Sequence, residues 1–281
     1  MAEWSAFGIA FRKGKGRLKM LAEERRFRIR EILATQRTVS AAALGEILKV
    51  TAVTIRRDLA ALEKAGELVR SHGGAVSRAS STNFQPNYDV LQRANKAEKL
   101  AIAAAAEKLI MDGDTVFLEA STTVFELSRR LGSFNRLTVA TNSPPIVCQL
   151  QRWRGIEVVC TGGDLHRDQF SLYGLWAQHA LSEIRVDKAV LGVTAIDAGY
   201  GHSCAKQAEA QVKKMLVKSG KQRIGLADHT KFGNQAFVFV GPITDFTTVI
   251  TDSKTDPAQI AGLRDAGVEV IVVDVEKDLP Q

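Results

Sequence analysis

The sequence predicts an α/β protein in two parts: a small cationic unit of three helices and a strand hairpin, then a larger unit built on a mostly parallel sheet. Two observations support this division. The first 78 residues hold 16 Lys or Arg and 8 Asp or Glu, whereas the rest hold 22 and 23, so the net charge of +7 belongs to the first quarter of the chain. From residue 96 onward, apolar runs alternate with helical segments, which is typical of a parallel sheet covered on both faces.

Composition excludes several classes of protein. With 281 residues, 45% hydrophobic and 25% charged, the chain is neither collagen-like, mucin-like nor wholly disordered. Apolar runs such as Ala101–Ala106 are far shorter than the roughly twenty residues that cross a bilayer. Residues 1–20 lack a secretory apolar core, and the three cysteines have no ligand spacing. We therefore expect a cytoplasmic protein with reduced thiols, with Cys148 and Cys160 in the core.

The chain divides into four segments. Residues 1–20 are expected to form a basic mobile arm, 21–77 a cationic helical unit, 78–95 a linker rich in Ser, Asn, Gln and Pro, and 96–275 a second α/β domain. An excess of cations in one unit indicates a polyanionic partner. The alternative is a solvated basic tail, since the segment from Arg12 to Lys19 alone supplies five cations.

The unit at residues 21–77 begins with a helix from Glu23. Ser40 is expected to cap a second helix that ends at the Lys49–Val50 turn, and Thr51 a third that runs to about Ala65. In the third helix Val53, Leu59 and Leu62 are expected to point inward, and Gly66 follows its end. Residues 68–76 then indicate a strand, a glycine turn and a second strand.

Three helices followed by a hairpin predict a winged helix-turn-helix, whose last helix enters the major groove of DNA. The hydroxyls and guanidinium groups at the start of that helix can reach base edges and phosphates. Arg57 paired with Asp58 or Glu63 on a solvated surface is the alternative. The candidate DNA-binding residues are Thr51, Thr54, Arg56 and Arg57 on the helix, with Arg70 and His72 on the wing.

The second domain follows an alanine-rich helix at residues 96–110. Its expected strands are residues 115–119, 137–140, 157–161, 188–193, 222–227, 247–251 and 269–273.

Polar residues follow several of these strands, and ligands of open α/β sheets bind beyond the carboxyl ends of the strands. Ser121, Thr122 and Thr123 can offer N–H and O–H groups to a phosphate, although such residues also cap helices without any ligand. Asn142 follows the next strand, and Asp228 and Lys231 follow a later one. The Asp228–Lys231 pair is alternatively a surface ion pair, and Glu209 alternatively a helical partner of Lys213.

No metal site or cofactor is expected. The histidines are too scattered along the chain to suggest a ligand set, and they lie at His166, His179, His202 and His229.

Residues 44–59, ending in Thr-Ile-Arg-Arg-Asp-Leu, together with His-Gly-Gly-Ala-Val at 72–76, resemble the DeoR family of bacterial transcriptional regulators. The resemblance implies that Thr54, Arg56 and Arg57 face operator DNA and that Asp58 helps to orient the arginines. Lys49 departs from the family pattern, which has glycine in this turn in many members.

The resemblance extends to the second domain, which is similar to the pentose-phosphate isomerase fold. Its landmarks are Asp-Gly-Asp-Thr at 112–115, the Ser-Thr-Thr loop, Thr-Asn-Ser at 141–143, Gly162-Gly163 and Asp-His-Thr-Lys-Phe-Gly at 228–233. It implies that the matching loops bind a phosphorylated sugar or sugar-like intermediate, with Asn142 and the Ser-Thr-Thr loop at the phosphate or adjacent hydroxyls. The rest of the effector would be surrounded by Asp197, Glu209, Asp228 and Lys231. Departures are Glu119, Ser121 and residues 202–205.

The predicted function is a sequence-specific repressor of carbohydrate or polyol catabolism genes, bound to double-stranded operator DNA and released by a phosphorylated sugar or polyol. Because one recognition helix covers few base pairs, we expect a homo-oligomer, a dimer or tetramer. One alternative is a sugar-phosphate isomerase with an appended DNA-binding domain. Glu119, Asp197 and Lys231 would then supply the general base and the electrophile. The acidic catalytic loop of that isomerase has no clear counterpart in this sequence. The other alternative is a nonspecific nucleic-acid chaperone using the arm from Arg12 to Arg30.

Overall fold

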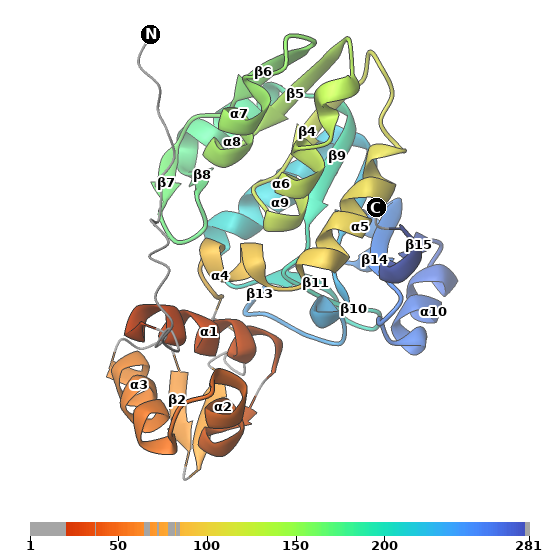
Figure 1. Ribbon diagram of the computed structural model, residues 1–281. Helices are drawn as coiled ribbons and strands as arrows, with labels where there is room; N and C mark the ends of the chain where they lie inside the picture. The colour runs from red at the N-terminus through yellow and green to blue at the C-terminus, as the bar shows by residue number, and fades with distance from the viewer. Residues whose placement is uncertain are drawn as a thin grey trace, which may run out of the picture.

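A computed structural model describes residues 21–36, 38–64, 68–71, 73–77, 82 and 85–278. The expected basic arm, Gly66 and His72 lie outside these residues. The described chain forms a winged helix at one end and a larger α/β unit at the other (Figure 1). The prediction of a winged helix-turn-helix followed by a mostly parallel α/β domain is confirmed.

The winged helix has three helices and a small antiparallel sheet of order β1-β3-β2. Its elements are α1 (Ala22–Thr35), β1 (Thr38–Ser40), α2 (Ala41–Leu48), α3 (Ala52–Lys64), β2 (Leu68–Ser71) and β3 (Gly74–Ser77). One apolar core joins them, including Ile29, Leu44, Ile55 and Leu59. Gly74 is required where β3 pairs with β1, because a Cβ there would lie 2.1 Å from the Val39 carbonyl oxygen.

Both expected helix caps are present. The Ala43 N–H donates to Ser40 Oγ (3.1 Å), and the Thr54 N–H donates to Thr51 Oγ1 (3.3 Å). Between the two helices Lys49 adopts the left-handed conformation (φ 54°). The expectation that Val53 points inward is wrong: its side chain is 72% exposed, because the apolar stripe of α3 runs through Ile55, Leu59 and Leu62.

The larger unit is organised around a seven-stranded sheet of order β15-β14-β12-β9-β4-β5-β6, in which every neighbouring pair is parallel. All seven strands predicted from the sequence are in it. They are β4 (Thr115–Leu118), β5 (Leu137–Thr141), β6 (Ile156–Cys160), β9 (Val186–Gly192), β12 (Gly220–Leu226), β14 (Thr248–Asp252) and β15 (Glu269–Val273).

Helices cover both faces of this sheet (Figure 1). One face packs against α5 (Lys96–Glu107), α6 (Thr122–Ser128) and α7 (Pro144–Leu150). The other packs against α8 (Gly174–Glu183), α9 (Gln207–Ser219) and α10 (Pro257–Asp265). Neighbouring residues of β4 show why its sequence is continuously apolar: Val116 and Leu118 belong to the first core and Phe117 to the second.

Two small antiparallel sheets and two short helices were not predicted. β7 (Asp164–His166) pairs with β8 (Ser171–Tyr173), and β11 (Gly201–Cys204) lies between β10 (Ala195–Asp197) and β13 (Val238–Gly241). Helix α11 (Val275–Asp278) follows the last strand, and α4 (Tyr88–Arg93) forms inside the segment expected to be linker. Asn87 Oδ1 caps α4 by accepting from the Val90 N–H (3.2 Å). Helix α4 packs against α1, so it lies between the two units (Figure 1).

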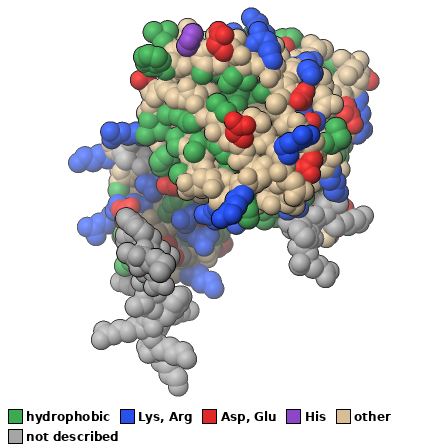
Figure 2. All heavy atoms as spheres, turned by 90° about the horizontal axis from the view of Figure 1, so that it is seen from above, with side chains coloured by type: hydrophobic (Ala, Val, Ile, Leu, Met, Phe, Trp, Pro, Cys, Tyr) green, Lys and Arg blue, Asp and Glu red, His purple; other side chains and the backbone are tan. Residues whose placement is uncertain are grey.

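The surface of the larger unit corrects one expectation. Cys148 and Cys160 are exposed, because they lie on α7 and on the edge strand β6, whereas Cys204 is buried. Figure 2 views the molecule from above, with hydrophobic side chains gathered over one half of the larger unit and Lys and Arg side chains projecting from the more distant winged helix. Within the described residues, no helix is long and apolar enough to span a membrane.

Candidate functional site

The start of α3 presents the residues expected to meet DNA. The hydroxyls of Thr51 and Thr54 are hydrogen-bonded to each other (3.0 Å) at the first turn, so the two side chains form one polar edge. Arg56 and Arg57 follow on the exposed side of the helix. Val53, also exposed there, adds an apolar group of the kind that contacts a thymine methyl.

Asp58 has a different partner from the one that the sequence and the family resemblance suggested. It is 2% exposed, and its carboxylate accepts hydrogen bonds from Arg25 Nε and, at 3.2 Å, from Arg25 Nη2. It therefore ties α3 to α1 in the interior instead of orienting Arg56 and Arg57. Its burial follows from its place one position before Leu59 on the inward side of the helix.

The wing is attached to the same helix. Glu63 of α3 accepts from the Arg70 N–H (3.2 Å), and the Arg70 guanidinium lies 3.7 Å from its other oxygen. The Arg70 side chain is 42% exposed, so it remains available at the surface beside α3. An exposed ion pair such as Arg70–Glu63 contributes little to the free energy of folding.

A cavity of about 500 Å³ lies beyond the carboxyl ends of β4, β9 and β12, which are adjacent in the sheet. Five of the eight predicted effector residues line it: Ser121, Thr122, Thr123, Glu209 and Lys231. One wall comes from outside the sheet, with Leu33 of α1, Gln85, and Leu91 of α4. The cavity therefore touches both units of the protein.

The floor of the cavity is a buried ionic cluster. Lys213 Nζ lies 2.6 Å from Glu119 Oε1 and 3.5 Å from Glu209 Oε1, and it donates to the Gly192 carbonyl (2.6 Å). Burial raises the pKa of Glu119 to about 7, despite the opposing attraction of Lys213. For Lys213 burial lowers the pKa, but the two carboxylates outweigh it and hold it above the usual value. Thr194 Oγ1 donates to Glu209 (2.9 Å), so this carboxylate is fixed as it faces the cavity.

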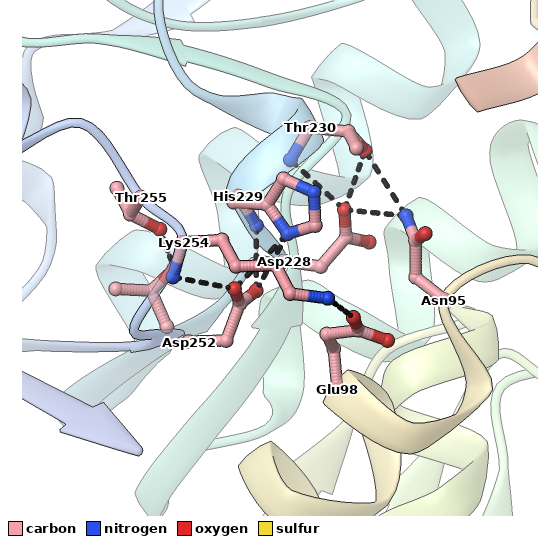
Figure 3. Close-up of polar contacts among 9 residues, drawn as sticks. Asn95, Glu98, Asp228, His229, Thr230, Asp252, Lys254 and Thr255 are labelled. Carbon is pink, nitrogen blue, oxygen red and sulfur yellow. Dashed lines mark hydrogen bonds and ion pairs between the residues drawn. The ribbon is translucent and has the colours of Figure 1, made fainter. Parts of the chain in front are cut away.

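Asp228 shapes the site from behind. It is 1% exposed, and its Oδ1 accepts from the Thr230 N–H and hydroxyl and from Asn95 Nδ2 (3.0 Å), as Figure 3 shows. These bonds hold the turn that carries Thr230 and Lys231 into the cavity lining. Beside it, Asp252 accepts from the His229 N–H (2.8 Å) and Nδ1 (3.0 Å), which fixes the same turn from its other side (Figure 3).

Asn142 and Asp197 also lie outside the cavity lining. Asn142 is fully buried and joins two loops, accepting from the Ala120 N–H (2.9 Å) and donating to the Leu172 carbonyl (3.3 Å). Asp197 caps the turn after β10, where it accepts from the Gly199 and Tyr200 N–H groups (3.0 Å each). The structure thus gives both residues positions that hold loops in place.

Several residues of the cavity lining escaped the sequence analysis, and Lys99 is the charged one among them. Lys99 of α5 is 2% exposed and lines the cavity on the side of Lys231 and Thr230. The sequence offered no signal for it, because a lysine in the first turn of an amphipathic helix is usually solvated.

Comparisons with known proteins find similarity along most of the chain. A family model described as the DeoR-like helix-turn-helix domain matches residues 25–81, and one described as the DeoR C terminal sensor domain matches residues 94–253. The chain is 36% identical over 258 residues to the HTH-type transcriptional regulator YulB of Bacillus subtilis, covering 92% of this chain and 99% of that protein. It is 34% identical over 236 residues to the transcriptional repressor AccR of Agrobacterium fabrum, covering 83% and 90% respectively.

Two further matches complete the comparison. The HTH-type transcriptional repressor GlcR of Bacillus subtilis is 33% identical over 258 residues, covering 92% of this chain and 99% of that protein. Among solved structures, ribose 5-phosphate isomerase A of Methanocaldococcus jannaschii is 19% identical with a TM-score of 0.37, covering 50% of this chain and 55% of that chain.

Proposed function

The chain belongs to the DeoR family of transcriptional regulators, with its helix-turn-helix and sensor domains in the family's order, and from this we propose that it represses genes of carbohydrate or polyol catabolism. A phosphorylated sugar or polyol is the proposed effector, and its binding releases the protein from double-stranded operator DNA. The single observation that carries the proposal is the composition of the cavity, which joins the hydroxyls of residues 121–123 and the ammonium groups of Lys99 and Lys231 to the carboxylate of Glu209.

The two kinds of group suit the two ends of such an effector. Lysine ammonium groups and hydroxyls give a phosphate charge-assisted hydrogen bonds, which are roughly twice as strong as neutral ones. A fixed carboxylate such as Glu209 accepts hydrogen bonds from sugar hydroxyls. A cavity of about 500 Å³ is also in the size range of small-molecule sites.

We propose binding in place of catalysis for this cavity. Isomerisation needs a general base beside the reacting carbon. Glu119, whose pKa is raised to about 7, is 1% exposed, is held by Lys213 and the Gly192 N–H (2.9 Å), and is not part of the cavity lining. Isomerisation assays with pentose and hexose phosphates against an enzyme-free control test this directly, and turnover above that control contradicts it.

A thermal-shift screen of phosphorylated sugars and polyols tests the effector class. A ligand that binds only the folded protein stabilises it by about 2.7 kcal/mol at a hundredfold excess over its Kd. We expect a phosphorylated compound to raise the Tm while its unphosphorylated parent does not, and to lower the affinity for an operator duplex selected from a random library. Equal shifts with parent and phosphate contradict the proposed class.

We also propose a homo-oligomer, dimer or tetramer, as the DNA-bound form, because one recognition helix covers few base pairs and repeated half-sites need several. Native mass spectrometry of the complex with the selected duplex measures the number of chains. A single chain on a high-affinity duplex contradicts this proposal.

A further inference from the structure

Lys99 connects two parts of the molecule through one ammonium group. It lies in the first turn of α5, and its Nζ donates to the backbone carbonyls of Leu91 and, at 2.6 Å, Ala94. These carbonyls are at the C-terminal end of α4, where a helix has no internal donors left to satisfy its last carbonyl groups. Lys99 therefore caps α4 from the neighbouring helix.

Lys99 also lines the cavity, as does Leu91, one of the two residues whose carbonyls it caps. Burial, followed by the repulsion of Lys231, lowers the pKa of Lys99 to about 8, so this cation lies in a costly environment. Its two acceptors are neutral carbonyls, whereas a phosphate oxygen carries negative charge and adds an ionic attraction to the hydrogen bond. An anion in the cavity thus competes with α4 for the same donor.

Helix α4 in turn contacts the winged helix. The Arg93 guanidinium carbon lies 4.2 Å from the centroid of the Phe27 ring in α1, and α4 packs along α1 (Figure 1). Helix α1 holds the recognition helix through the buried pair of Arg25 and Asp58. A continuous set of contacts therefore runs from the cavity through Lys99, α4 and α1 to α3.

We propose that Lys99 is the residue that couples the cavity to the winged helix: an anionic group bound beside Lys231 takes the Lys99 ammonium from the C-terminal carbonyls of α4, and the uncapped α4 loosens its contact with α1. This inference rests on the proposed function in taking the cavity as an anion site. An effector shifts an equilibrium only through its different affinity for two states, and here the states differ in the partner of one ammonium.

Hydrogen–deuterium exchange on the full chain tests the first step, with inorganic phosphate as the probe and sodium chloride at matched ionic strength as the control. We expect phosphate to raise the exchange rate of the amides at residues 90–94 by about fivefold or more, the low end of typical couplings. Lys99→Met should show this faster exchange without phosphate and no further change with it. Lys108→Met, which removes an exposed lysine at the other end of the same helix, should respond as the wild type does.

The second step is tested by affinity for the selected operator duplex. Phosphate should weaken binding of the wild type to this duplex by about 5- to 150-fold. In Arg93→Gln, phosphate should cause no such loss of affinity but should still raise the Tm. Because Arg93 lies on α4 away from the cavity lining, this variant remains informative even if Lys99→Met fails to fold.

The outcomes separate the two claims. A Tm shift with phosphate but unchanged exchange at residues 90–94, or an Arg93→Gln protein that releases DNA like the wild type, overturns the coupling and leaves the cavity proposal standing. The absence of any Tm shift with phosphate and with every phosphorylated compound of the screen overturns both.

Discussion

At the scale of single residues, the interior of the winged helix depends on a charged pair. Asp58 and Arg25 are 2% and 8% exposed, and they join helices that are otherwise held by apolar contacts. A buried ion pair adds little stability compared with an apolar pair of the same shape, but the loss of one partner leaves an uncompensated buried charge. The pair therefore fixes which way α3 faces more than it strengthens the unit.

Replacing Asp58 should be costly. We expect Asp58→Ala to lower the free energy of unfolding of the winged helix by about 3–5 kcal/mol, because the buried Arg25 guanidinium loses two hydrogen bonds to a carboxylate. Thermal denaturation followed by circular dichroism measures the change. The neighbouring variant Arg57→Ala, which removes an exposed charge from the same helix, should change stability by less than about 0.5 kcal/mol. Equal losses in the two variants would contradict the role of the buried pair.

Arg56 tests the assignment of the DNA interface. Arg56→Ala should weaken binding to the selected duplex by about 1–3 kcal/mol if its guanidinium reads a base. Lys64→Ala is the matched control, since it removes an exposed cation from the opposite end of α3. Fluorescence anisotropy with the selected and a scrambled duplex at one salt concentration separates a loss of sequence-specific binding from a loss of sequence-independent binding. Unchanged affinity for both duplexes in Arg56→Ala removes this residue from the interface.

The pKa of Lys99 predicts a pH dependence. Because burial and Lys231 lower this pKa to about 8, the folded protein carries a neutral amine above that pH and an ammonium below it. A bound phosphate dianion favours the ammonium, so affinity for inorganic phosphate should fall as the pH rises through about 8, by up to tenfold per unit. Charged groups near Lys99 are Lys231, Asp228, Lys96 and Glu126.

Isothermal titration calorimetry measures this pH profile. Lys99→Met should remove the step near pH 8, whereas Lys108→Met should retain it. A step that persists in Lys99→Met belongs to another of the nearby groups.

Several residues whose roles the sequence could not predict have partners that are remote along the chain. Asp58 bonds to a residue 33 positions earlier, and Asn95 donates to Asp228, 133 positions away. By contrast, Ser40 and Thr51 were predicted as caps because their partners lie three residues ahead. Ser121 and Lys231 both line the cavity because parallel strands bring their carboxyl ends to one edge of the sheet.

At the scale of elements, strand length decided what the sequence could predict. The seven parallel strands have four to seven residues, and β4, β5, β9, β14 and β15 contribute apolar side chains to both cores, whereas β6 and β12 contribute to one. The strands were therefore visible as apolar runs. The strands of the two small sheets have three or four residues, and β11 reads Gly-His-Ser-Cys, which has no apolar alternation. Helix α4 was missed for a similar reason, since six residues after a Pro- and Asn-rich stretch resemble a loop.

The turn between α2 and α3 gives a prediction at this scale. Lys49 occupies the left-handed region with φ 54°, which costs a residue with a Cβ of order 1–3 kcal/mol. Lys49→Gly should raise the stability of the winged helix by about 0.5–1 kcal/mol, the net of relieved strain and the greater chain entropy of glycine. Gly74→Ala should do the opposite, because its Cβ would meet the Val39 carbonyl at 2.1 Å.

Chemical denaturation of both variants measures these changes. Lys49→Gly tests the effect of a left-handed backbone conformation on stability, and Gly74→Ala tests the effect of a close approach between two strands. A loss of stability in Lys49→Gly would mean that the lysine side chain, and not its backbone, determines this turn.

At the scale of the whole molecule, the cavity is lined by residues of both the winged helix and the larger unit. The hydroxyls of residues 121–123 lie at the start of α6 and Lys231 on the 3₁₀ turn after β12, whereas Leu33 comes from the winged helix and Leu91 from α4. A ligand that fills this space contacts both units at once, so it can bind more tightly to one relative arrangement than to another. This differential affinity is the thermodynamic requirement for a regulated DNA-binding protein.

Lys231 separates effector binding from DNA binding. Lys231→Ala should leave affinity for the selected duplex within about twofold, because the residue lies in the cavity and not on α3. The concentration of phosphorylated effector that releases half of the DNA should rise by at least about tenfold, since a hydrogen bond to a charged group contributes roughly 1.5–3 kcal/mol.

The control for this last variant is Lys221→Ala, which removes a lysine whose side chain is 80% exposed at the other end of β12, and which should behave as the wild type. Titration of the protein–duplex complex with the strongest compound of the screen, followed by anisotropy, measures both variants. Release at the wild-type concentration would place the effector outside the cavity. Weak DNA binding by Lys231→Ala without any effector would instead mean that its charge supports the DNA-bound arrangement of the two units.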